Sequence, residues 1–556
     1  MPLRGKPTTE AEKIVFRHEA ELPPMTRSMG TVLINKTGSW RYLRPVYEEK
    51  TPPCRDACPA GIDIQGFVDM LARGEPLEAW RLIRESSPLP GVCGRVCPHP
   101  CERSCNRGEF DEAISIHALE RLAADRALNE GVGEEPRAPK KEERVAIIGS
   151  GPAGLSCAHF LGREGYGVTV FEALPRPGGM LRVGIPEYRL PRTVLDKEIA
   201  DIEALGVSFQ TGARIGDIGE LADYDAVFVA TGAHKSRSLN IPGEDAAGVI
   251  PGVEFLKNLN LGGKNQAGER VLVVGGGNTA IDAARSALRL GARTTIVYRR
   301  TREEMPAIEE EIEAALAEGV DILYLATPRM ALVKDGRVAQ VGLIKTELAE
   351  PDETGRRRPV EVAGSEFMIE ADTVITALGE APDLSFLPEH AGLSEEPREI
   401  DGTPVFGGGD AFTGAGTVVH AIASGRRGAR AIISRLAGAG VAHEPPGPVV
   451  PFESVNTACF ARQPAVRMPE VPVAERVSGF AEVNRGLPLT DGLEEAKRCF
   501  SCGVCNLCDN CLIFCPDIAV IRLNDSYEID YDYCKGCGIC AVECPGNVIS
   551  LVEEER

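Results

Sequence analysis

Two runs of four cysteines late in the sequence share one spacing, and a proline follows each run. They read Cys505-x2-Cys508-x2-Cys511-x3-Cys515 and Cys534-x2-Cys537-x2-Cys540-x3-Cys544. Three thiolates at two-residue gaps can turn around one iron–sulfur cubane, whereas the fourth, beside its proline, reaches a neighbouring cubane. The spacing therefore predicts two 4Fe–4S clusters. We assign Cys505, Cys508, Cys511 and Cys544 to one cluster, and Cys515, Cys534, Cys537 and Cys540 to the other.

The same cysteines offer two other interpretations, a zinc site and a disulfide framework. Zinc takes four ligands in a closed tetrahedron, which does not match a doubled pattern of four plus four with prolines. The pattern is typical of the bacterial ferredoxin fold, so we predict an α+β module with two 4Fe–4S clusters over residues 496–556.

The composition limits the class of protein. With 556 residues, 43% of them hydrophobic, and no long apolar run, the chain is expected to form several soluble domains without a membrane span. Its 82 acidic and 61 basic residues give a net charge of -21, which repels the backbone of nucleic acids. The 18 cysteines are spaced for metal rather than for pairing, and no apolar signal core is present, so we expect a cytoplasmic protein.

The order of patterns along the chain predicts a multidomain protein. From Arg144 to about Gly438, short Val/Ile/Ala strands alternate with amphipathic helices, which is typical of parallel sheets covered on both faces. A cysteine-rich stretch and a helix from Ile114 to about Leu128 come before it and predict an N-terminal α-helical Fe–S domain. The predicted boundaries are 1–50 for an N-terminal arm, 51–135 for the helical Fe–S domain, 141–260 and 370–440 for a first Rossmann-like α/β domain, 261–369 for a second, 441–495 for a proline-rich linker, and 496–556 for the two-cluster module.

The first Rossmann-like domain contains a pyrophosphate-binding pattern. The strand Val145–Ile148 runs into Gly149-Ser150-Gly151-Pro152-Ala153-Gly154, which opens the next helix as G-x-G-x-x-G. The glycines permit a tight turn, close approach of phosphate, and close contact of helix and strand, while the helix N-terminus favours negative charge. Glu172 ends the following strand, where a carboxylate can bind a ribose hydroxyl. An ordinary tight turn is the alternative for the glycines alone.

A second unit of the same kind predicts a second dinucleotide site. The strand Val271–Val274 is followed by Gly275-Gly276-Gly277-Asn278-Thr279-Ala280, in which Ala280 replaces the third glycine. After the next strand come Arg299 and Arg300, where an NAD site would carry an acid. Because a guanidinium matches phosphate bidentately, these arginines favour NADP(H) over NAD(H). Solvated charges at the end of a strand are the alternative, and an NAD enzyme could carry them too.

Further motifs resemble the glutamate synthase small subunit family, which includes the NADPH-reactive part of dihydropyrimidine dehydrogenase. They are Gly178-Gly179-Met180-Leu181, the run Gly184–Pro191, Ala230-Thr231-Gly232, Gly409-Asp410 with Thr417-Val418-Val419, and Gly276–Asp282 with Tyr298-Arg299-Arg300. The resemblance spans about residues 54–435. It implies FAD in the first site, with Asp410 near the ribitol and Thr417 near the flavin ring, and NADPH in the second. The cofactor-binding residues assigned beyond the two glycine units are Glu172, Gly179, Met180, Leu181, Arg189, Ala230, Thr231, Gly232, Gly379, Gly409, Asp410, Thr417 and Val418.

The same resemblance implies two more 4Fe–4S clusters in the N-terminal helical domain. Cys54-x3-Cys58-Pro59 and the run Cys93, Cys97, Cys101, Cys105 match the family's elements, but its Arg-Cys-x2-Cys element is missing upstream. When the family's ligand positions are mapped onto this sequence residue by residue, Cys58, Cys97 and Cys101 bind one cluster. Its fourth ligand falls at Glu120, where relatives carry Glu or Gln.

The other N-terminal cluster keeps Cys54 and Cys105 and lacks two ligands. The run Glu494–Cys502 looks like the missing element moved to a position just before the ferredoxin motif, so Cys499 and Cys502 are expected to complete this cluster. In this hypothesis 15 of the 18 cysteines hold four clusters, Cys157 is a small core residue, and Cys93 and Cys459 have no role. If the hypothesis fails, only three clusters assemble.

A second resemblance concerns both ends of the chain. Asn35–Arg41, Arg44-Pro45-Val46, Asp530–Cys540 and Glu543-Cys544-Pro545 resemble the delta subunit of pyruvate:ferredoxin oxidoreductases. This likeness implies that the flavoprotein is inserted between the ends of such a subunit. It also implies a thiamine diphosphate-dependent 2-oxoacid oxidoreductase as partner.

These observations predict an electron-transfer flavoprotein subunit of a 2-oxoacid:acceptor oxidoreductase complex. Electrons would move between 4Fe–4S clusters, FAD and NAD(P)(H), with ferredoxin as a second candidate partner. No side chain needs to act as acid, base or nucleophile, because the cofactors carry the chemistry. The alternatives are a glutamate synthase small subunit, a stand-alone NADPH:ferredoxin oxidoreductase, and a non-enzymatic electron-storage or assembly protein. His99 is expected to be a local hydrogen-bonding residue rather than a ligand.

Overall fold

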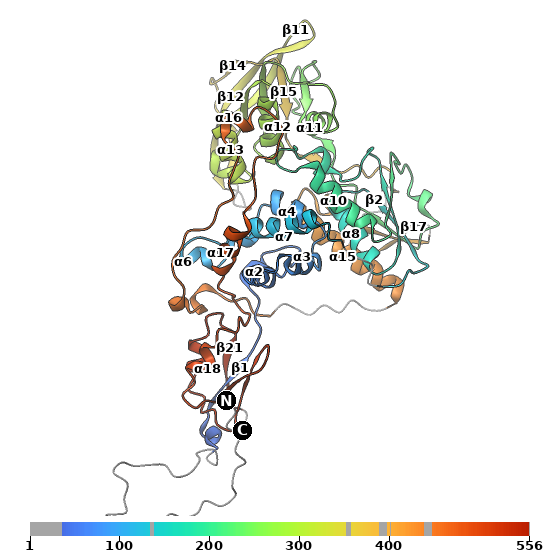
Figure 1. Cartoon of the computed structure of the whole chain (residues 1–556). Helices are drawn as coiled ribbons and strands as arrows, with labels where there is room; N and C mark the ends of the chain where they lie inside the picture. Colours follow the sequence, from blue (N-terminus) through green and yellow to red (C-terminus); the bar gives the residue numbers. More distant parts are fainter. Residues whose placement is uncertain are drawn as a thin grey trace, which may run out of the picture. The chain divides into compact units, whose positions relative to one another are not determined.

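The computed structural model describes residues 36–133, 138–351, 357–388, 397–400, 402–438 and 447–554. The chain divides into two compact units (Figure 1). The smaller unit consists of Met1–Pro53, Pro446–Arg462 and Phe500–Arg556, and the larger one of Cys54–Pro445 and Gln463–Cys499. The two ends of the chain therefore belong to one unit, and most of the sequence between them forms the other.

The larger unit begins with short helices, several of which start at a proline, a residue suited to the first helical turn. Asp63 caps α2, because its carboxylate accepts a hydrogen bond from the Gly66 N–H at 3.2 Å. The longest helix of this part, α7, ends at Gly131, which has φ 68. The helices are α1 (Pro53–Asp56), α2 (Ile64–Ala72), α3 (Pro76–Arg84), α4 (Pro90–Val96), α5 (Pro100–Arg103), α6 (Arg107–Phe110) and α7 (Ile116–Glu130).

The first Rossmann-like domain is built on a six-stranded sheet in the order β17-β18-β5-β2-β3-β4, parallel except at β17. Buried side chains of the helical domain, such as Phe67 and Trp80, share one hydrophobic core with Val145 and Ile147 of β2. The helical domain and this sheet are therefore packed as one body. The elements are β2 (Arg144–Ile148), α8 (Pro152–Arg163), β3 (Gly167–Glu172), α9 (Met180–Val183), α10 (Arg192–Glu203), β4 (Ser208–Thr211), η4 (Ile218–Leu221), β5 (Ala226–Val229), β17 (Arg398–Ile400), β18 (Thr403–Gly407), α14 (Asp410–Thr413) and α15 (Val418–Ala437).

The second Rossmann-like domain has a five-stranded parallel sheet in the order β10-β9-β8-β15-β7. Its first and last strands along the chain, β7 and β15, lie outside the predicted range 261–369, so this domain is longer at both ends than the sequence suggested. The elements are β7 (Val249–Pro251), α11 (Gly252–Asn260), β8 (Arg270–Val274), α12 (Asn278–Arg289), β9 (Arg293–Tyr298), η5 (Arg302–Glu304), α13 (Glu309–Glu318), β10 (Asp321–Tyr324) and β15 (Thr373–Thr376), with an antiparallel sheet of β11 (Ala326–Lys334), β12 (Arg337–Pro351), β13 (Arg357–Glu361) and β14 (Phe367–Glu370), and a connecting pair β6 (Lys235–Ser236) and β16 (Glu380–Ala381).

In the smaller unit the N-terminal segment folds onto the cysteine-rich module. β1 pairs antiparallel with β21, and Arg41 forms an ion pair with Glu554 at 2.6 Å. Thr37 donates a hydrogen bond to the Tyr533 carbonyl at 2.7 Å. Residues 36–50 are thus part of this module rather than a separate arm, and Asn35 lies outside the described residues. The elements are η3 (Thr37–Trp40), β1 (Leu43–Tyr47), η6 (Phe452–Ser454), η7 (Thr457–Cys459), α18 (Asn510–Ile513), β19 (Val520–Arg522), β20 (Tyr527–Ile529), α19 (Ile539–Val542) and β21 (Ile549–Glu553).

The segment Gln463–Cys499, which we call the strap, belongs to the larger unit and was predicted to be mostly linker. It contains α16 (Val473–Arg476) and α17 (Leu489–Lys497). Its Glu482 forms an ion pair with Arg95 of α4 at 2.8 Å, and the Val483 N–H donates to the Tyr188 carbonyl at 3.0 Å. The strap therefore joins the helical domain to the first Rossmann-like domain. Among the described residues, no helix combines the length and apolar character needed to cross a bilayer.

Candidate cofactor and electron-transfer sites

A cavity of about 370 Å³ lies in the first Rossmann-like domain. Segments that are far apart in the sequence meet around it, and most of the residues assigned to FAD line it. They are Gly149, Gly151, Pro152, Ala153, Glu172, Gly179, Met180, Leu181, Ala230, Thr231, Gly232, Gly409, Asp410, Thr417 and Val418. Among the lining residues that the sequence did not single out are His234, Lys257, Arg214 and Asp383. Burial lowers the pKa of His234, so its imidazole is neutral at pH 7.

The glycines of the first unit occupy the positions that the pattern demands. A Cβ at Gly154 would lie 1.9 Å from the Gly149 carbonyl oxygen, so only glycine lets α8 approach this turn. Gly149 itself has φ +100 and faces the Ala230 carbonyl. A Cβ at Gly151, by contrast, would meet no atom within 4 Å, which leaves room for a pyrophosphate at the start of α8.

The Glu172 carboxylate is held in place at the end of β3. One oxygen accepts hydrogen bonds from the Ser150 N–H at 3.0 Å and hydroxyl at 2.5 Å, and the other accepts from the Leu174 N–H at 2.8 Å. A carboxylate has about four acceptor positions, so it can still bind a ribose hydroxyl in the cavity it lines. The residues present therefore fit a dinucleotide cofactor such as FAD.

Two residues assigned to the cofactor lie elsewhere. Arg189 is buried and forms ion pairs with Asp282 at 2.7 Å and Glu311 at 2.8 Å, so its guanidinium joins the two Rossmann-like domains instead of lining the cavity. Gly379 accepts a hydrogen bond at its carbonyl from the Arg237 N–H at 3.2 Å, beside the β6/β16 pair that connects these domains. Arg189 was assigned to cofactor binding, and that assignment stays a prediction because its guanidinium is held by these two ion pairs.

The second dinucleotide unit has the same strand–turn–helix geometry. Gly275 has φ +146, and a Cβ at Gly276 would lie 2.5 Å from the Tyr298 ring. The Asn278 side chain accepts a hydrogen bond from the Ile308 N–H at 3.0 Å and so holds the loop after β9 near the start of α12. Gly277 and Thr279 flank Asn278 at this helix N-terminus. This arrangement suits a pyrophosphate.

Arg299 and Arg300 follow β9 directly, at the carboxyl edge of the sheet. Arg299 is exposed and has no ion pair within the described part of the chain, so its guanidinium can take a phosphate. Arg300 donates a hydrogen bond to the Arg357 carbonyl at 2.9 Å, which fixes the direction of its side chain. Because an adenosine ribose binds at the end of the second strand of this fold, the pair fits a 2'-phosphate.

Cys58, Cys97, Cys101 and Glu120 line one cavity in the helical domain. Glu120 Oε1 is buried and has no hydrogen-bond partner, and burial together with Glu198 and Glu102 raises the pKa of Glu120 to about 8. Such an orphaned acceptor beside three thiols calls for a cation. Burial also raises the pKa of Cys97 to about 12, so iron binding would have to displace its proton. The donor set fits a 4Fe–4S cluster.

Cys93, which was not assigned to a cluster, lines the same cavity. It lies four residues before Cys97, the residue that follows α4, and a spacing of four residues places both cysteines on one side of the helix. Burial raises the pKa of the Cys93 thiol.

The separations of the sulfurs distinguish iron–sulfur from zinc sites. A tetrahedral zinc with Zn–S of about 2.3 Å brings its sulfurs to about 3.8 Å from one another. Within the described residues, the ligand groups with all atoms inside 4.8 Å are limited to His99, Glu102 and His117, with no cysteine among them. No disulfide joins any of the 18 cysteines. In the part of the chain that the structure describes, no three cysteine sulfurs therefore lie as close together as a tetrahedral zinc site needs.

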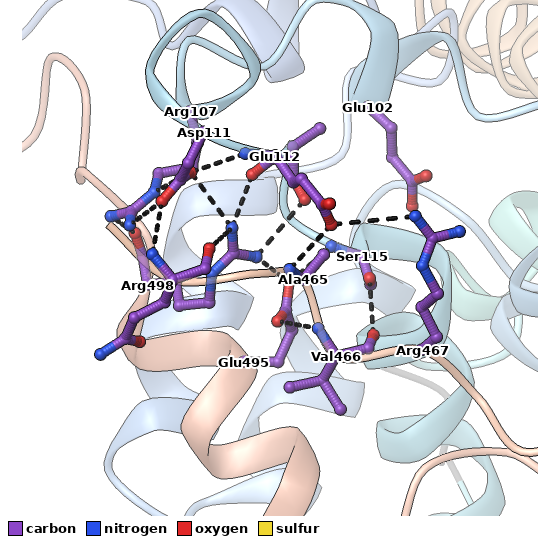
Figure 2. A network of polar contacts seen from close by, with 12 residues as sticks. Glu102, Arg107, Asp111, Glu112, Ser115, Ala465, Val466, Arg467, Glu495 and Arg498 are labelled. Carbon is purple, nitrogen blue, oxygen red and sulfur yellow. Dashed lines mark hydrogen bonds and ion pairs between the residues drawn. The ribbon is translucent and has the colours of Figure 1, made fainter. Parts of the chain in front are cut away.

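Three of the four residues assigned to the other N-terminal cluster, Cys54, Cys105 and Cys499, are partly buried against the core of the larger unit. Figure 2 shows the polar contacts of Arg498, the residue that precedes Cys499 in the sequence. The neighbouring Arg498 forms ion pairs with Asp111 at 3.2 Å and with Glu495 at 2.7 Å.

Arg107 of α6 also belongs to this network, because its guanidinium donates a hydrogen bond to the Arg498 carbonyl at 2.9 Å. These contacts attach the end of the strap to the helical domain. Cys502 belongs to the smaller unit, whereas Cys54, Cys105 and Cys499 belong to the larger one. A cluster held by Cys54, Cys105, Cys499 and Cys502 stays a prediction.

The two ferredoxin-type sets are brought together as the spacing predicted. Cys515, Cys534, Cys537 and Cys540 line one cavity, so the fourth cysteine of the first run does meet the first three of the second. The reverse crossing is seen at Cys511, whose pKa is raised by burial and also by the sulfurs of Cys505, Cys508 and Cys544. The N-terminal segment contributes Tyr47, whose hydroxyl donates to the Cys511 sulfur at 3.2 Å.

Comparison with known proteins agrees with this division of the chain. Residues 143–425 match the family of pyridine nucleotide-disulphide oxidoreductases. Residues 46–132 match dihydropyrimidine dehydrogenase domain II, 4Fe-4S cluster, and residues 527–550 match a 4Fe-4S binding domain.

Three relatives are similar over most of their length. The chain is 42% identical over 500 residues to the beta subunit of the NADP(+)-dependent formate dehydrogenase of Moorella thermoacetica, which covers 81% of this chain and 70% of the relative. It is 39% identical over 509 residues to the beta subunit of the NADPH-Fe(3+) oxidoreductase of Geobacter sulfurreducens, with 82% and 75% covered. It is 37% identical over 418 residues to the small chain of the NADPH glutamate synthase of Halomonas elongata, with 69% and 88% covered. The chain therefore belongs to the pyridine nucleotide-disulphide oxidoreductase family and is an NAD(P)H-dependent FAD and iron–sulfur oxidoreductase.

Proposed function

We propose that the chain is the NADP(H)-linked electron-transfer subunit of a larger oxidoreductase and holds FAD and four 4Fe–4S clusters. One observation carries this proposal. Val418 at the start of α15 lines the cavity assigned to FAD, and the next residue, Val419, lines the cavity of Cys58, Cys97, Cys101 and Glu120. Consecutive Cα atoms are about 3.8 Å apart. The two sites are therefore neighbours, as electron transfer between them requires.

The residues of the chain then have separate tasks. Glu172 and the glycine turn bind the adenosine end of one dinucleotide, while Arg299 and Arg300 select the phosphate of the other. Glu120 and three cysteines hold the nearest cluster, and the buried Val419 separates it from the FAD site. When bound, FAD supplies the exchange between a hydride carrier and one-electron clusters.

The proposed partner is a thiamine diphosphate-dependent 2-oxoacid oxidoreductase. The delta-like segments at the two ends of the chain support it, because residues 36–47 and 530–553 fold together through β1, β21 and the Thr37–Tyr533 hydrogen bond. With pyruvate as the 2-oxoacid, the balanced reaction would be pyruvate + CoA + NADP+ → acetyl-CoA + CO2 + NADPH.

A second candidate follows from the relatives. The two that cover about four fifths of this chain are subunits of a formate dehydrogenase and of an NADPH-Fe(3+) oxidoreductase. Their similarity favours a partner that oxidises formate or passes electrons to ferric iron.

Native purification without oxygen separates these candidates. The complex is assayed for NADP+ reduction with pyruvate plus CoA and, in parallel, with formate, and for NADPH oxidation with Fe(III) citrate. We expect activity with pyruvate and CoA and a co-purifying thiamine enzyme. Activity with formate or Fe(III) alone, or glutamate formation from glutamine and 2-oxoglutarate, would reject the 2-oxoacid partner.

A further inference from the structure

Ile518 in the smaller unit has two features that are each unfavourable. Its φ is +53, a left-handed conformation that is a genuine outlier for a β-branched residue. Its side chain is 82% exposed, so the residue recovers no buried apolar area from within the chain. Because neither the backbone conformation nor the exposed side chain of Ile518 stabilises the fold, we expect the side chain to contact another molecule.

The internal repeat shows what the backbone prefers at this position. Ile518 follows Cys515 by three residues, and Asn547 follows Cys544 by three residues with φ +56. The next N–H donates to the cysteine sulfur at 3.3 Å in both copies. Asn tolerates this conformation well, so the turn itself does not call for isoleucine.

Other exposed apolar side chains come from neighbouring segments of the same module. Ile513 and Phe514 at the end of α18 are 69% and 51% exposed, and Val542 at the end of α19 is 70% exposed. The two helices are neighbours, because the Asn510 side chain donates to the Glu543 carbonyl at 3.1 Å. We call Ile513, Phe514, Ile518 and Val542 the docking face. Ile513 and Phe514 lie in the sequence between Cys511 and Cys515, which belong to the two ferredoxin-type cysteine sets.

The charge around the docking face indicates its occupant. Residues 500–556 contain ten acidic and three basic residues, and residues 36–53 of the same unit add two acidic and four basic ones, which gives a net charge of -5. Two of the basic residues, Arg522 and Lys535, already pair with Asp509 and Asp517. An apolar patch in an acidic surround is complementary to an apolar patch rimmed by Lys and Arg.

We propose that the docking face receives a separate redox protein whose apolar contact patch is ringed by basic residues, and that electrons cross there between the ferredoxin-type clusters and this partner. The proposal deepens the function proposed above, since it names the surface and the charge of the partner. Horse cytochrome c, which is basic around an exposed apolar haem edge, serves as the probe. The balanced reaction is NADPH + 2 ferricytochrome c → NADP+ + H+ + 2 ferrocytochrome c.

The test compares Ile518→Asn with wild type and with the control Leu332→Asn. Leu332 is 40% exposed on β11 in the larger unit, so the control makes the same kind of change elsewhere. Because Asn suits the left-handed turn, Ile518→Asn is expected to keep or raise the unfolding midpoint. We expect it to raise the KM for cytochrome c about five- to tenfold at low salt, with little change in kcat. Added salt should raise the wild-type KM as well.

The controls separate the possible failures. NADPH oxidation by ferricyanide, a small acceptor, should be unchanged in Ile518→Asn. No such activity in wild type would reject the proposed function itself, whereas equal cytochrome c kinetics in wild type and Ile518→Asn would overturn the docking face alone. Sedimentation in which wild type is a dimer and Ile518→Asn a monomer would assign the face to a second copy and also overturn the proposal.

Discussion

Replacing Arg498 by Met should release the end of the strap from the helical domain. The Arg498 side chain is 2% exposed and pairs with Glu495, which is 0% exposed, and with Asp111. It also donates to the Glu112 carbonyl at 2.7 Å. Removing one partner of a buried ion pair costs about 3–5 kcal/mol, because the other charge stays buried without compensation.

Hydrogen exchange followed by mass spectrometry measures this loss. If α17 opens locally, about 3–5 kcal/mol corresponds to exchange that is about 100- to 5,000-fold faster in residues 489–498. The neighbouring change Lys497→Met is the matched control, since Lys497 pairs with Glu494 on the surface, with both side chains more than half exposed, and should alter exchange less than about fivefold. Equal protection of α17 in Arg498→Met and Lys497→Met would refute the role of this network.

Three other predictions concern the sites themselves. Arg299→Ala should raise the KM for NADPH about 10- to 100-fold and leave that for NADH unchanged in steady-state assays, and an equal effect on both would contradict the phosphate assignment. Glu120→Gln keeps a ligand oxygen and should retain the nearby cluster, whereas Glu120→Ala should lose it. Iron quantitation should then find about four fewer iron atoms per chain in the alanine variant. A full iron content in that variant would show that Glu120 is not a ligand. Burial raises the pKa of Glu198 to about 8, so between about pH 4.5 and 8 the folded state keeps a proton that the unfolded state releases. The free energy of unfolding should therefore fall as pH rises through this range. Glu198→Gln should flatten this pH dependence in urea titrations, and an unchanged pH dependence would contradict the prediction.

The sites that depend on short patterns could be predicted from the sequence. The glycine turns at Gly149 and Gly275 and the paired cysteine runs are encoded in fewer than fifteen consecutive residues each, and the structure brings those residues together. Even the crossing of Cys515 to the second run follows from its spacing.

The contacts of the strap could not be predicted in this way. Arg95 meets Glu482 across 387 positions of sequence, and the strap has no hydrophobic period that would mark it as structured. The ion pairs of Arg189 could not be predicted for a related reason: its motif is local, but its partners Asp282 and Glu311 come from another domain. The strands β7 and β15 were assigned to the wrong domain because three or four residues carry too little pattern to show which sheet they join.

The central claim is that cysteines from remote parts of the chain complete four clusters. Iron and sulfide quantitation on the full chain prepared without oxygen tests it most directly, in wild type and in the Cys499→Ala/Cys502→Ala variant. The account predicts about 16 iron atoms per chain in wild type and about 12 in the variant, with FAD content unchanged. Equal iron in the two proteins would contradict it.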